Sequence, residues 1–243
     1  ETVHIHAFSP LEIDHGRRTL NISVEEFLTE LKNAGLNSLP GTAAEILDDD
    51  IRAIICPDKL NSQEWADVIM AAHSVGLPTT STMMFGHVEN MSHVARHFGV
   101  LKAIQNKTNG ITEFVPLPFV ASEAPIYMRG LSRPGPTFKE SVLVHAAARI
   151  FFYDSIDNIQ GSWVKMGLPG LKFLLSAGIN DVGGILMNES ITKAAGASFG
   201  QELNLVDVDR IAKSLDLDLV QRNTLYQKLD SQISDLSKSQ SIP

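Results

Sequence analysis

The sequence Thr79-Thr80-Ser81-Thr82-Met83-Met84 decides the fold, because it begins a strand–helix–strand unit. Its residues favour a β-strand, and the segment at about 92–106 has the apolar spacing of an amphipathic helix. A second strand is predicted at residues 111–115. Short apolar strands alternate with amphipathic helices along the rest of the chain as well. This pattern is typical of a parallel α/β sheet or barrel.

The same pattern predicts about six strands and at least five helices. One helix is marked by Ser23 and Glu26, which fit a capping box, and by Gly35, which ends it. Another follows Ser62 and ends before Gly76. The remaining helices are predicted at about 92–106, 138–152 and 166–176, and the strands at residues 3–8, 38–39, 79–84, 111–115, 156–160 and 184–187.

Six strands suit part of a closed barrel, because an eight-stranded barrel takes ~250 residues with its loops. We therefore expect a partial TIM-type (βα) barrel over residues 1–200, without its first two units. Residues 201–243 are expected to form a C-terminal extension with a flexible tail, rich in Ser and Gln. The chain begins inside its first predicted strand, so we expect it to be the later part of a larger catalytic domain.

Composition argues against several classes of protein. The net charge of −8 disfavours a general nucleic-acid or membrane-surface binder, and no apolar run approaches the ~20 residues of a membrane helix. The single cysteine, Cys56, excludes an internal disulfide and favours a reducing compartment. We expect a cytoplasmic location, with an organellar targeting segment before residue 1 left open.

Polar side chains gather where the predicted strands end, which is where sites lie in a parallel barrel. Glu113 is the most informative, because a carboxylate in a barrel strand needs a partner when it is buried. Each of the others has a structural alternative, such as core packing for His4 and His6 or turn support for Glu45. The residues singled out as candidates for a binding site are His4, His6, Ser9, Glu12, Glu45, Thr80, Thr82, His87, Glu89, Glu113, Asn158, Gln160, Ser162, Trp163, Asn188 and Glu189.

Several motifs, taken in order, resemble the CofH-type radical SAM enzymes. Three of them are Ser38-Leu39-Pro40-Gly41-Thr42-Ala43-Ala44-Glu45, Thr82-Met83-Met84-Phe85-Gly86-His87-Val88-Glu89 and Thr112-Glu113-Phe114-Val115-Pro116-Leu117-Pro118-Phe119. The others are the segments 4–10, 55–59, 158–160, 162–165, 186–190 and 221–226. The resemblance covers about residues 3–226, and its specificity comes from the number of motifs in the right order.

The resemblance implies a function. Enzymes of this type make FO, the precursor of coenzyme F420. They act either together with a separate CofG-type partner or as half of a fused FO synthase. A 4Fe–4S cluster cleaves S-adenosyl-L-methionine to a 5′-deoxyadenosyl radical, which activates L-tyrosine. The 4-hydroxybenzyl group is then transferred to 5-amino-6-(D-ribitylamino)uracil. The resemblance implies that the candidate residues named above bind substrate or S-adenosyl-L-methionine, and it identifies no catalytic residue among them.

The chain departs from the family in one important respect. The Cys-x-x-x-Cys-x-x-Cys cluster motif and the glycine-rich segment that contacts S-adenosylmethionine are absent, and both are expected before residue 1. Cys56 alone does not replace three thiolate ligands. We therefore expect no metal site on this chain, no cluster and no turnover by the chain alone.

Other functions remain open at this point. The related menaquinone-pathway enzymes, aminofutalosine synthase and dehypoxanthine futalosine cyclase, share the barrel and the cofactor. His4 and His6 also match the first-strand pair of metal-dependent amidohydrolase barrels, although no later ligand set follows them. An inactive remnant or a binding module derived from the enzyme is the alternative of another class.

Overall fold

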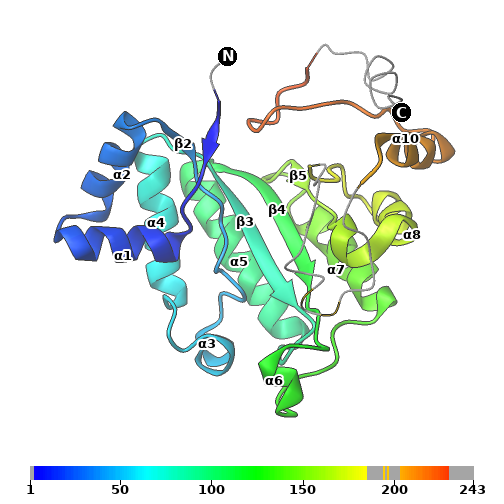
Figure 1. Ribbon diagram of the computed structural model, residues 1–243, viewed down its shortest axis with the longest axis horizontal. Helices are drawn as coiled ribbons and strands as arrows, with labels where there is room; N and C mark the ends of the chain where they lie inside the picture. Colours follow the sequence, from blue (N-terminus) through cyan, green and yellow to red (C-terminus); the bar gives the residue numbers. More distant parts are fainter. Residues whose placement is uncertain (1–2, 185–193, 195, 197–202, 230–243) are drawn as a thin grey trace.

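The computed structural model describes residues 3–184, 194, 196 and 203–229. Five parallel strands run in chain order across it (Figure 1). They are β1 (Ile5–His6), β2 (Leu36–Ser38), β3 (Thr79–Phe85), β4 (Ile111–Pro118) and β5 (Asn158–Ile159). An isolated parallel bridge from Leu39 to Thr79 joins the β1–β2 pair to the other three strands. This order, with each strand beside its neighbour in sequence, is that of a barrel wall.

The predicted strands agree with this sheet. Five of the six lie at the expected places, and β3 with β4 forms the longest pairing, from Thr79↔Ile111 to Phe85↔Pro118. A further parallel bridge, Gln160↔Asp181, continues the sheet beyond β5. Of the sixth predicted strand, residues 185–187 lie outside the described residues.

The helices connect these strands. Figure 1 shows α5 and α7 behind β3 and β4, with α4 and α8 on either side of them. The predicted helices are confirmed, although α8 is kinked at Gly167, which has non-helical backbone angles. The described helices are α1 (Pro10–Leu20), α2 (Val24–Asn33), α3 (Asp49–Ile55), α4 (Ser62–Ser74), α5 (Met91–Thr108), α6 (Pro125–Met128), α7 (Phe138–Phe151), α8 (Trp163–Ser176) and α10 (Leu205–Ser214).

Helix α1 was not predicted from the sequence, and the candidate residues Ser9 and Glu12 form its start. Ser9 is the N-cap of α1, its hydroxyl accepts from the backbone N–H of Glu12, and the Glu12 carboxylate accepts from the backbone N–H of Ser9 at 2.7 Å. Pro10 occupies the first helical turn, where its missing N–H costs nothing. The stretch Ser9-Pro10-Leu11-Glu12 is therefore a helix start with a complete capping box.

The core lies between the sheet and its helices, on the side of the sheet that α5 and α7 cover. Phe114 is fully buried there, with its ring centroid 5.4 Å from that of Phe98 and 5.2 Å from that of Phe152. Along β3, Thr79, Ser81, Met83 and Phe85 are buried, whereas Thr80, Thr82 and Met84 are half-buried. Successive side chains of a strand point to opposite faces, so Thr80, Thr82 and Met84 face the barrel interior.

Among the residues that the structure describes, none of the helices has both the length and the apolar character required to cross a membrane.

The aromatic core gives a prediction for stability. Phe114→Ala should lower the free energy of unfolding by about 3–5 kcal/mol, because it leaves a cavity among Phe98, Phe152 and their neighbours. Tyr153→Ala is the matched control, since its ring is 81% exposed and its loss should change stability by less than ~0.5 kcal/mol. Urea unfolding measures both. Equal effects of the two substitutions would contradict this placement of the core.

Candidate functional site

Glu113 stands at the centre of a polar cluster on the interior face of the sheet. It lies near the start of β4, paired in register with Thr80 of β3, and its side chain is only 2% exposed. The Tyr226 hydroxyl donates to Glu113 Oε2 at 2.7 Å, and Gln160 Nε2 donates to the same oxygen at 2.9 Å. We call Glu113, Gln160, Asp181, Arg222 and Tyr226 the Glu113 cluster.

The other carboxylate oxygen of Glu113 has no hydrogen-bond partner among the described residues. Its neighbouring cation is Arg222, whose Nη2 is 3.8 Å from Oε1. Arg222 is already committed elsewhere, because its Nε donates to Asp181 and its guanidinium lies 4.1 Å from the centroid of the Tyr226 ring. Two carboxyl groups thus share one guanidinium in a buried place.

This environment raises the pKa of the Glu113 carboxyl group. Burial and the nearby charge of Asp181 raise the pKa of Glu113 to about 8, against the lowering effects of Tyr226, Arg222 and Gln160. Burial and the Glu113 carboxyl also raise the pKa of the Tyr226 phenol. At neutral pH the cluster therefore holds a largely un-ionised acid, which avoids a second buried negative charge.

A cavity of about 250 Å³ opens beside this cluster. Glu113, Gln160, Arg222 and Tyr226 line it together with Thr80, Ser38 and His6. His6 Nδ1 and His4 Nε2 both lie within hydrogen-bond distance of the Ser38 hydroxyl, at 2.6 and 2.7 Å. Burial and the neighbouring His4 lower the pKa of His6, so a neutral imidazole faces the cavity at pH 7.

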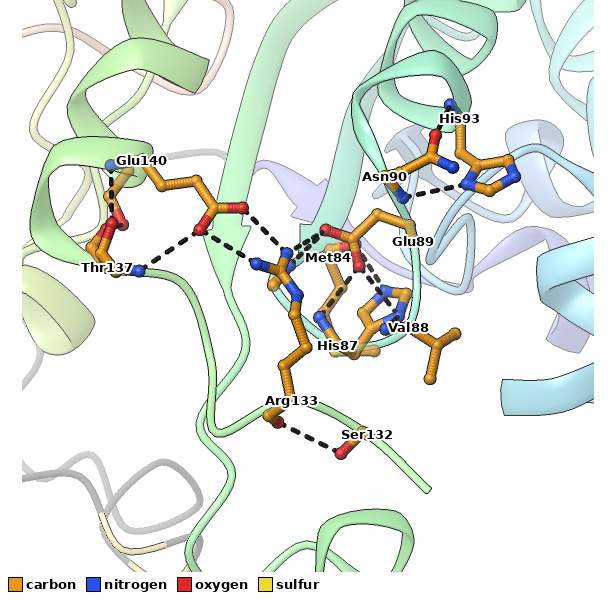
Figure 2. A network of polar contacts seen from close by, with 12 residues as sticks. Met84, His87, Val88, Glu89, Asn90, His93, Ser132, Arg133, Thr137 and Glu140 are labelled. Atoms are coloured by element: carbon orange, nitrogen blue, oxygen red, sulfur yellow. Dashed lines mark hydrogen bonds and ion pairs between the residues drawn. The ribbon is translucent and has the colours of Figure 1, made fainter. Parts of the chain in front are cut away.

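A second cluster lies at the opposite end of the sheet, where β3 ends (Figure 2). We call His87, Glu89, Arg133 and Glu140 the rim network. The Glu89 carboxylate accepts from the backbone N–H groups of Gly86 and His87, at 2.6 and 2.9 Å, and pairs with Arg133 Nη2 at 3.0 Å. Arg133 also pairs with Glu140 at 2.8 Å, so the network ties the loop after β3 to the start of α7.

The rim network depends on a glycine and on a neutral histidine. Gly86 has φ +96°, and a Cβ there would lie 2.2 Å from Pro136 Cδ. Burial lowers the pKa of His87, although the nearby Glu89 opposes this. His87 Nδ1 accepts from the Val88 N–H at 2.8 Å while Nε2 donates to Met84 O at 3.0 Å, so the contact with Glu89 is not an ion pair.

The segment 39–45 lies along β3 and determines the positions of two further predicted residues, Thr82 and Glu45. The Thr82 hydroxyl donates to Gly41 O at 2.9 Å, and Met84 N–H donates to Glu45 O at 2.8 Å. Gly41 packs so closely that a Cβ would lie 2.0 Å from Thr80 O. The Glu45 carboxylate forms an ion pair with Lys59 at 2.7 Å. Glu45 therefore stands near the rim, in a loop held against the sheet.

The structure brings together part of the predicted set. His6, Thr80, Glu113 and Gln160 meet at the cavity, with His4 one hydrogen bond away, and His87 meets Glu89 at the rim. The others lie apart: Asn158 donates to Thr112 O, Ser162 precedes α8, Trp163 Nε1 donates to Gly184 O, and Ser9 and Glu12 cap α1. Asn188 and Glu189 lie outside the described residues.

Five residues of these clusters were not predicted from the sequence: Asp181, Arg222, Tyr226, Arg133 and Glu140. Arg222 and Tyr226 fall in the segment 221–226, which carried a motif of the family but no assigned role. The sequence indicated that a buried Glu113 needs a polar partner. It did not indicate which residue would be that partner. Arg133 follows a loop without periodicity and carried no signal.

The residues present do not fit an iron–sulfur cluster. Cys56 is the single cysteine, it is 4% exposed, and burial raises the pKa of its thiol. Across the described part of the chain, no group of three or more His, Cys, Asp or Glu side chains is arranged to hold a metal ion. His4 and His6 instead share the Ser38 hydroxyl, which does not support the amidohydrolase reading.

The rim network gives a second prediction. Glu89→Ala should lower the free energy of unfolding by about 2–4 kcal/mol, because it leaves two N–H groups unsatisfied and Arg133 without its buried partner. Glu30→Ala is the matched control on the exposed surface of α2, with an expected change below ~0.5 kcal/mol. Urea unfolding at pH 7 compares them. A loss for Glu89→Ala no greater than that of the control would show that the rim network contributes nothing to stability.

Comparison with solved structures supports the fold. The chain is similar to the crystal structure of methylornithine synthase (PylB), with a TM-score of 0.63 over 89% of this chain and 58% of that chain. At 14% sequence identity this likeness concerns the fold alone. The expected partial parallel barrel is thereby confirmed.

Relatives of higher identity cover most of the chain. The 5-amino-6-(D-ribitylamino)uracil–L-tyrosine 4-hydroxyphenyl transferase of Methanothermobacter thermautotrophicus is 48% identical over 94% of this chain, which spans 62% of that protein. That of Methanocaldococcus jannaschii is 47% identical, and the chain spans 64% of it. The FO synthase of Nocardia farcinica is also 47% identical, and the chain spans 26% of it.

The chain thus spans less than two thirds of each of these relatives. The family described as the CofH/MqnC C-terminal region matches residues 108–232, which include β4, Gln160 and the segment that carries Arg222 and Tyr226. This match and the identities confirm the resemblance to CofH-type proteins. The chain belongs to the CofH/MqnC C-terminal region family.

Proposed function

We propose that this chain forms the substrate-binding part of a radical SAM transferase. The reaction would move the 4-hydroxybenzyl group of L-tyrosine to 5-amino-6-(D-ribitylamino)uracil, in the synthesis of FO. The observation that carries this proposal is the 48% identity to a transferase of that name over 94% of the chain. The two polar clusters on the barrel support the proposal, because their side chains can form hydrogen bonds with polar substrates.

The interior face offers the groups that such substrates require. A ribityl chain and an aminouracil ring carry hydroxyl, amide and carbonyl groups close to one another. Thr80, Gln160 and the un-ionised Glu113 supply both donors and acceptors, and the neutral His6 supplies another. A pocket with a few convergent polar groups between apolar walls is the usual form of a small-molecule site. These residues would bind and orient the polar substrate.

The Glu113 cluster and the rim network lie at opposite ends of the strands. Thr80 lies on β3 and Gly86 directly follows its last residue, so the two are six residues apart, which is about 20 Å at the rise of a parallel strand. One small substrate therefore does not contact both clusters. We propose that the Glu113 cluster forms the floor of the substrate space and that the rim network shapes its mouth at the carboxyl ends of the strands.

The cofactors belong to the complete protein under this proposal. A 4Fe–4S cluster would cleave S-adenosyl-L-methionine to supply the radical, and its thiolate ligands would come from outside this chain, which has one cysteine. The residues of this chain would bind the substrates, orient them and exclude water. We propose that a CofG-type protein, separate or fused, supplies the other half of FO synthesis.

The decisive assay uses the full native protein that contains this chain, reconstituted anaerobically with iron and sulfide. We expect product formation from L-tyrosine and 5-amino-6-(D-ribitylamino)uracil in the presence of S-adenosylmethionine and a reductant, detected by mass. Turnover of futalosine-pathway substrates instead would replace this proposal with the menaquinone-pathway alternative. No turnover of either set would favour a binding module or an inactive remnant.

The chain alone provides a control for the cofactor part of the proposal. After the same anaerobic reconstitution, residues 1–243 should hold no stable cluster and should form no 5′-deoxyadenosine, because three thiolate ligands are lacking. Iron analysis and the absorbance of the cluster measure this. A stable cluster that cleaves S-adenosylmethionine would contradict the assignment of its ligands to the rest of the protein.

A further inference from the structure

Arg52, on α3, is a buried cation that pairs with no carboxylate among the described residues. It is only 3% exposed. Its guanidinium donates instead to backbone carbonyl oxygens, which belong to two separate segments of the chain. A buried charge without a counter-ion is costly, and here hydrogen bonds to carbonyl groups offset that cost. The position of those carbonyl groups is therefore the first clue to what Arg52 does.

Three of these bonds fix the backbone around Glu45. Arg52 Nη1 donates to Ala44 O and, at 3.2 Å, to Ile46 O, while Nη2 donates to Ala43 O at 3.3 Å. Ala43 and Glu45 have φ angles of 59° and 45°, in the left-handed region that residues with a side chain seldom occupy. Such strain persists where several contacts hold it, and it gathers at functional sites. Arg52 thus holds residues 43–46 in a turn that local preferences disfavour.

The other two bonds fix the backbone beside Lys59. Arg52 Nε donates to Leu60 O at 2.8 Å, and Nη2 donates to the same oxygen. Leu60 directly follows Lys59, whose Nζ lies 2.7 Å from Glu45 Oε1. The two side chains of this ion pair are partly exposed, so the pair contributes little by itself to holding the segments together. A single buried guanidinium therefore connects the two backbone segments that carry the Glu45–Lys59 pair.

The Glu45–Lys59 pair stands beside the rim network. Met84, the next-to-last residue of β3, donates its N–H to Glu45 O at 2.8 Å. Burial lowers the pKa of His87, and nearby carboxylates, that of Glu45 among them, oppose this. Figure 1 shows α3 at the end of the sheet toward which β3 and β4 point. The pair is thus at the carboxyl ends of the strands, where the proposed substrate space has its mouth.

We propose that Arg52 is a positioning residue: it holds the Glu45–Lys59 pair at the mouth, where the pair binds a substrate group that carries a hydrogen-bond donor beside an acceptor. This inference rests on the proposed function. The Glu45 carboxylate accepts from the donor of that group, and the Lys59 ammonium donates to its acceptor. The head group of an amino acid, two adjacent hydroxyls of a ribityl chain and the amide edge of a pyrimidine all have this form.

Lysine does not replace arginine in this role. A guanidinium has five N–H donors in a planar fork, whereas an ammonium group has its three donors on one atom. In Arg52, different nitrogens reach Ala44 O and Leu60 O, which lie on the two separate segments. The Arg52→Lys variant keeps the charge but loses hydrogen bonds to at least one segment. Glu45 and Lys59 are then no longer held in a fixed relation to each other.

Equilibrium dialysis of the full native protein, reconstituted anaerobically, tests the inference with three probes: L-tyrosine, 5-amino-6-(D-ribitylamino)uracil and S-adenosylmethionine. Glu45→Gln should raise the Kd of one probe about 10–100-fold, because a hydrogen bond to a charged group is lost, and should change the other two by less than about threefold. The probe that is affected identifies the group that the pair binds. Arg52→Lys should raise the Kd of the same probe to a similar extent.

A double variant separates positioning from general damage to the structure. Arg52→Lys combined with Glu45→Gln should weaken binding no further than Glu45→Gln alone, because Arg52 acts through Glu45. Arg149→Lys is the matched control, since Arg149 also donates to backbone carbonyls, those of Gly178 and Asp157, at the end of α7 away from the rim network. It should leave all three Kd values unchanged. Circular dichroism verifies that each variant is folded.

The outcomes distinguish this inference from the proposed function. Unchanged Kd values for all three probes in Glu45→Gln, or a further loss in the double variant, would overturn the inference and leave the proposed function intact. An equal loss for all three probes would also overturn it, because that result reports damage to the barrel. A wild type that binds neither L-tyrosine nor the aminouracil would refute the proposed function and this inference with it. Glu45→Gln changes a partly exposed side chain, so it tests the pair independently of whether Arg52→Lys folds.

Discussion

The parallel pairing of β3 with β4, from Thr79↔Ile111 to Phe85↔Pro118, determines which side chains meet the helices and which meet the barrel interior. Because strand side chains alternate, one residue of slippage would move Phe114 out of the aromatic core and Glu113 out of the interior. The register also places Thr80 opposite Glu113, and β5 adds Gln160 beside them. The position of the Glu113 cluster therefore follows from the register that buries the core.

The buried carboxyl groups at the two ends of the sheet differ in how their charge is compensated. At the rim, Glu89 accepts two backbone N–H bonds and pairs with Arg133, so its charge is compensated. At the floor, Glu113 competes with Asp181 for a single guanidinium and is held largely without charge. Such an ionic network holds the loop after β3 in one conformation. An un-ionised acid suits a surface that meets polar, uncharged parts of a ligand.

The elements with strong local signals were predictable from the sequence. β3, α5 and β4 combine strand-forming residues with a clear helical period, and α2 is ended by Gly35 as expected. β4 runs three residues beyond its predicted end at Val115, because the fixed φ of Pro116 and Pro118 is compatible with an extended backbone. The α1 helix was missed because its capping residues are polar and follow a strand, as residues of a site do.

The site was predictable only in part, for a physical reason. The burial of Glu113 in a strand implied that it has a partner, and alternation along β3 placed Thr80 and Thr82 on one face. The partner is Tyr226, more than a hundred residues away, beyond the last helix that the structure describes. No periodicity links two such positions. Long-range contacts between a strand and a C-terminal hairpin are set by tertiary packing, which local patterns do not record.

The most direct test of this account is a structure of the full native protein with L-tyrosine and 5-amino-6-(D-ribitylamino)uracil bound. The account predicts that the pyrimidine lies on the interior face of β3 and β4, with its polar groups in hydrogen-bond contact with Gln160 or Thr80 at the floor. It also predicts that the rim network is intact and that Tyr226 is docked on Glu113. Substrates bound away from this face, with the interior of β3 and β4 unoccupied, would contradict it.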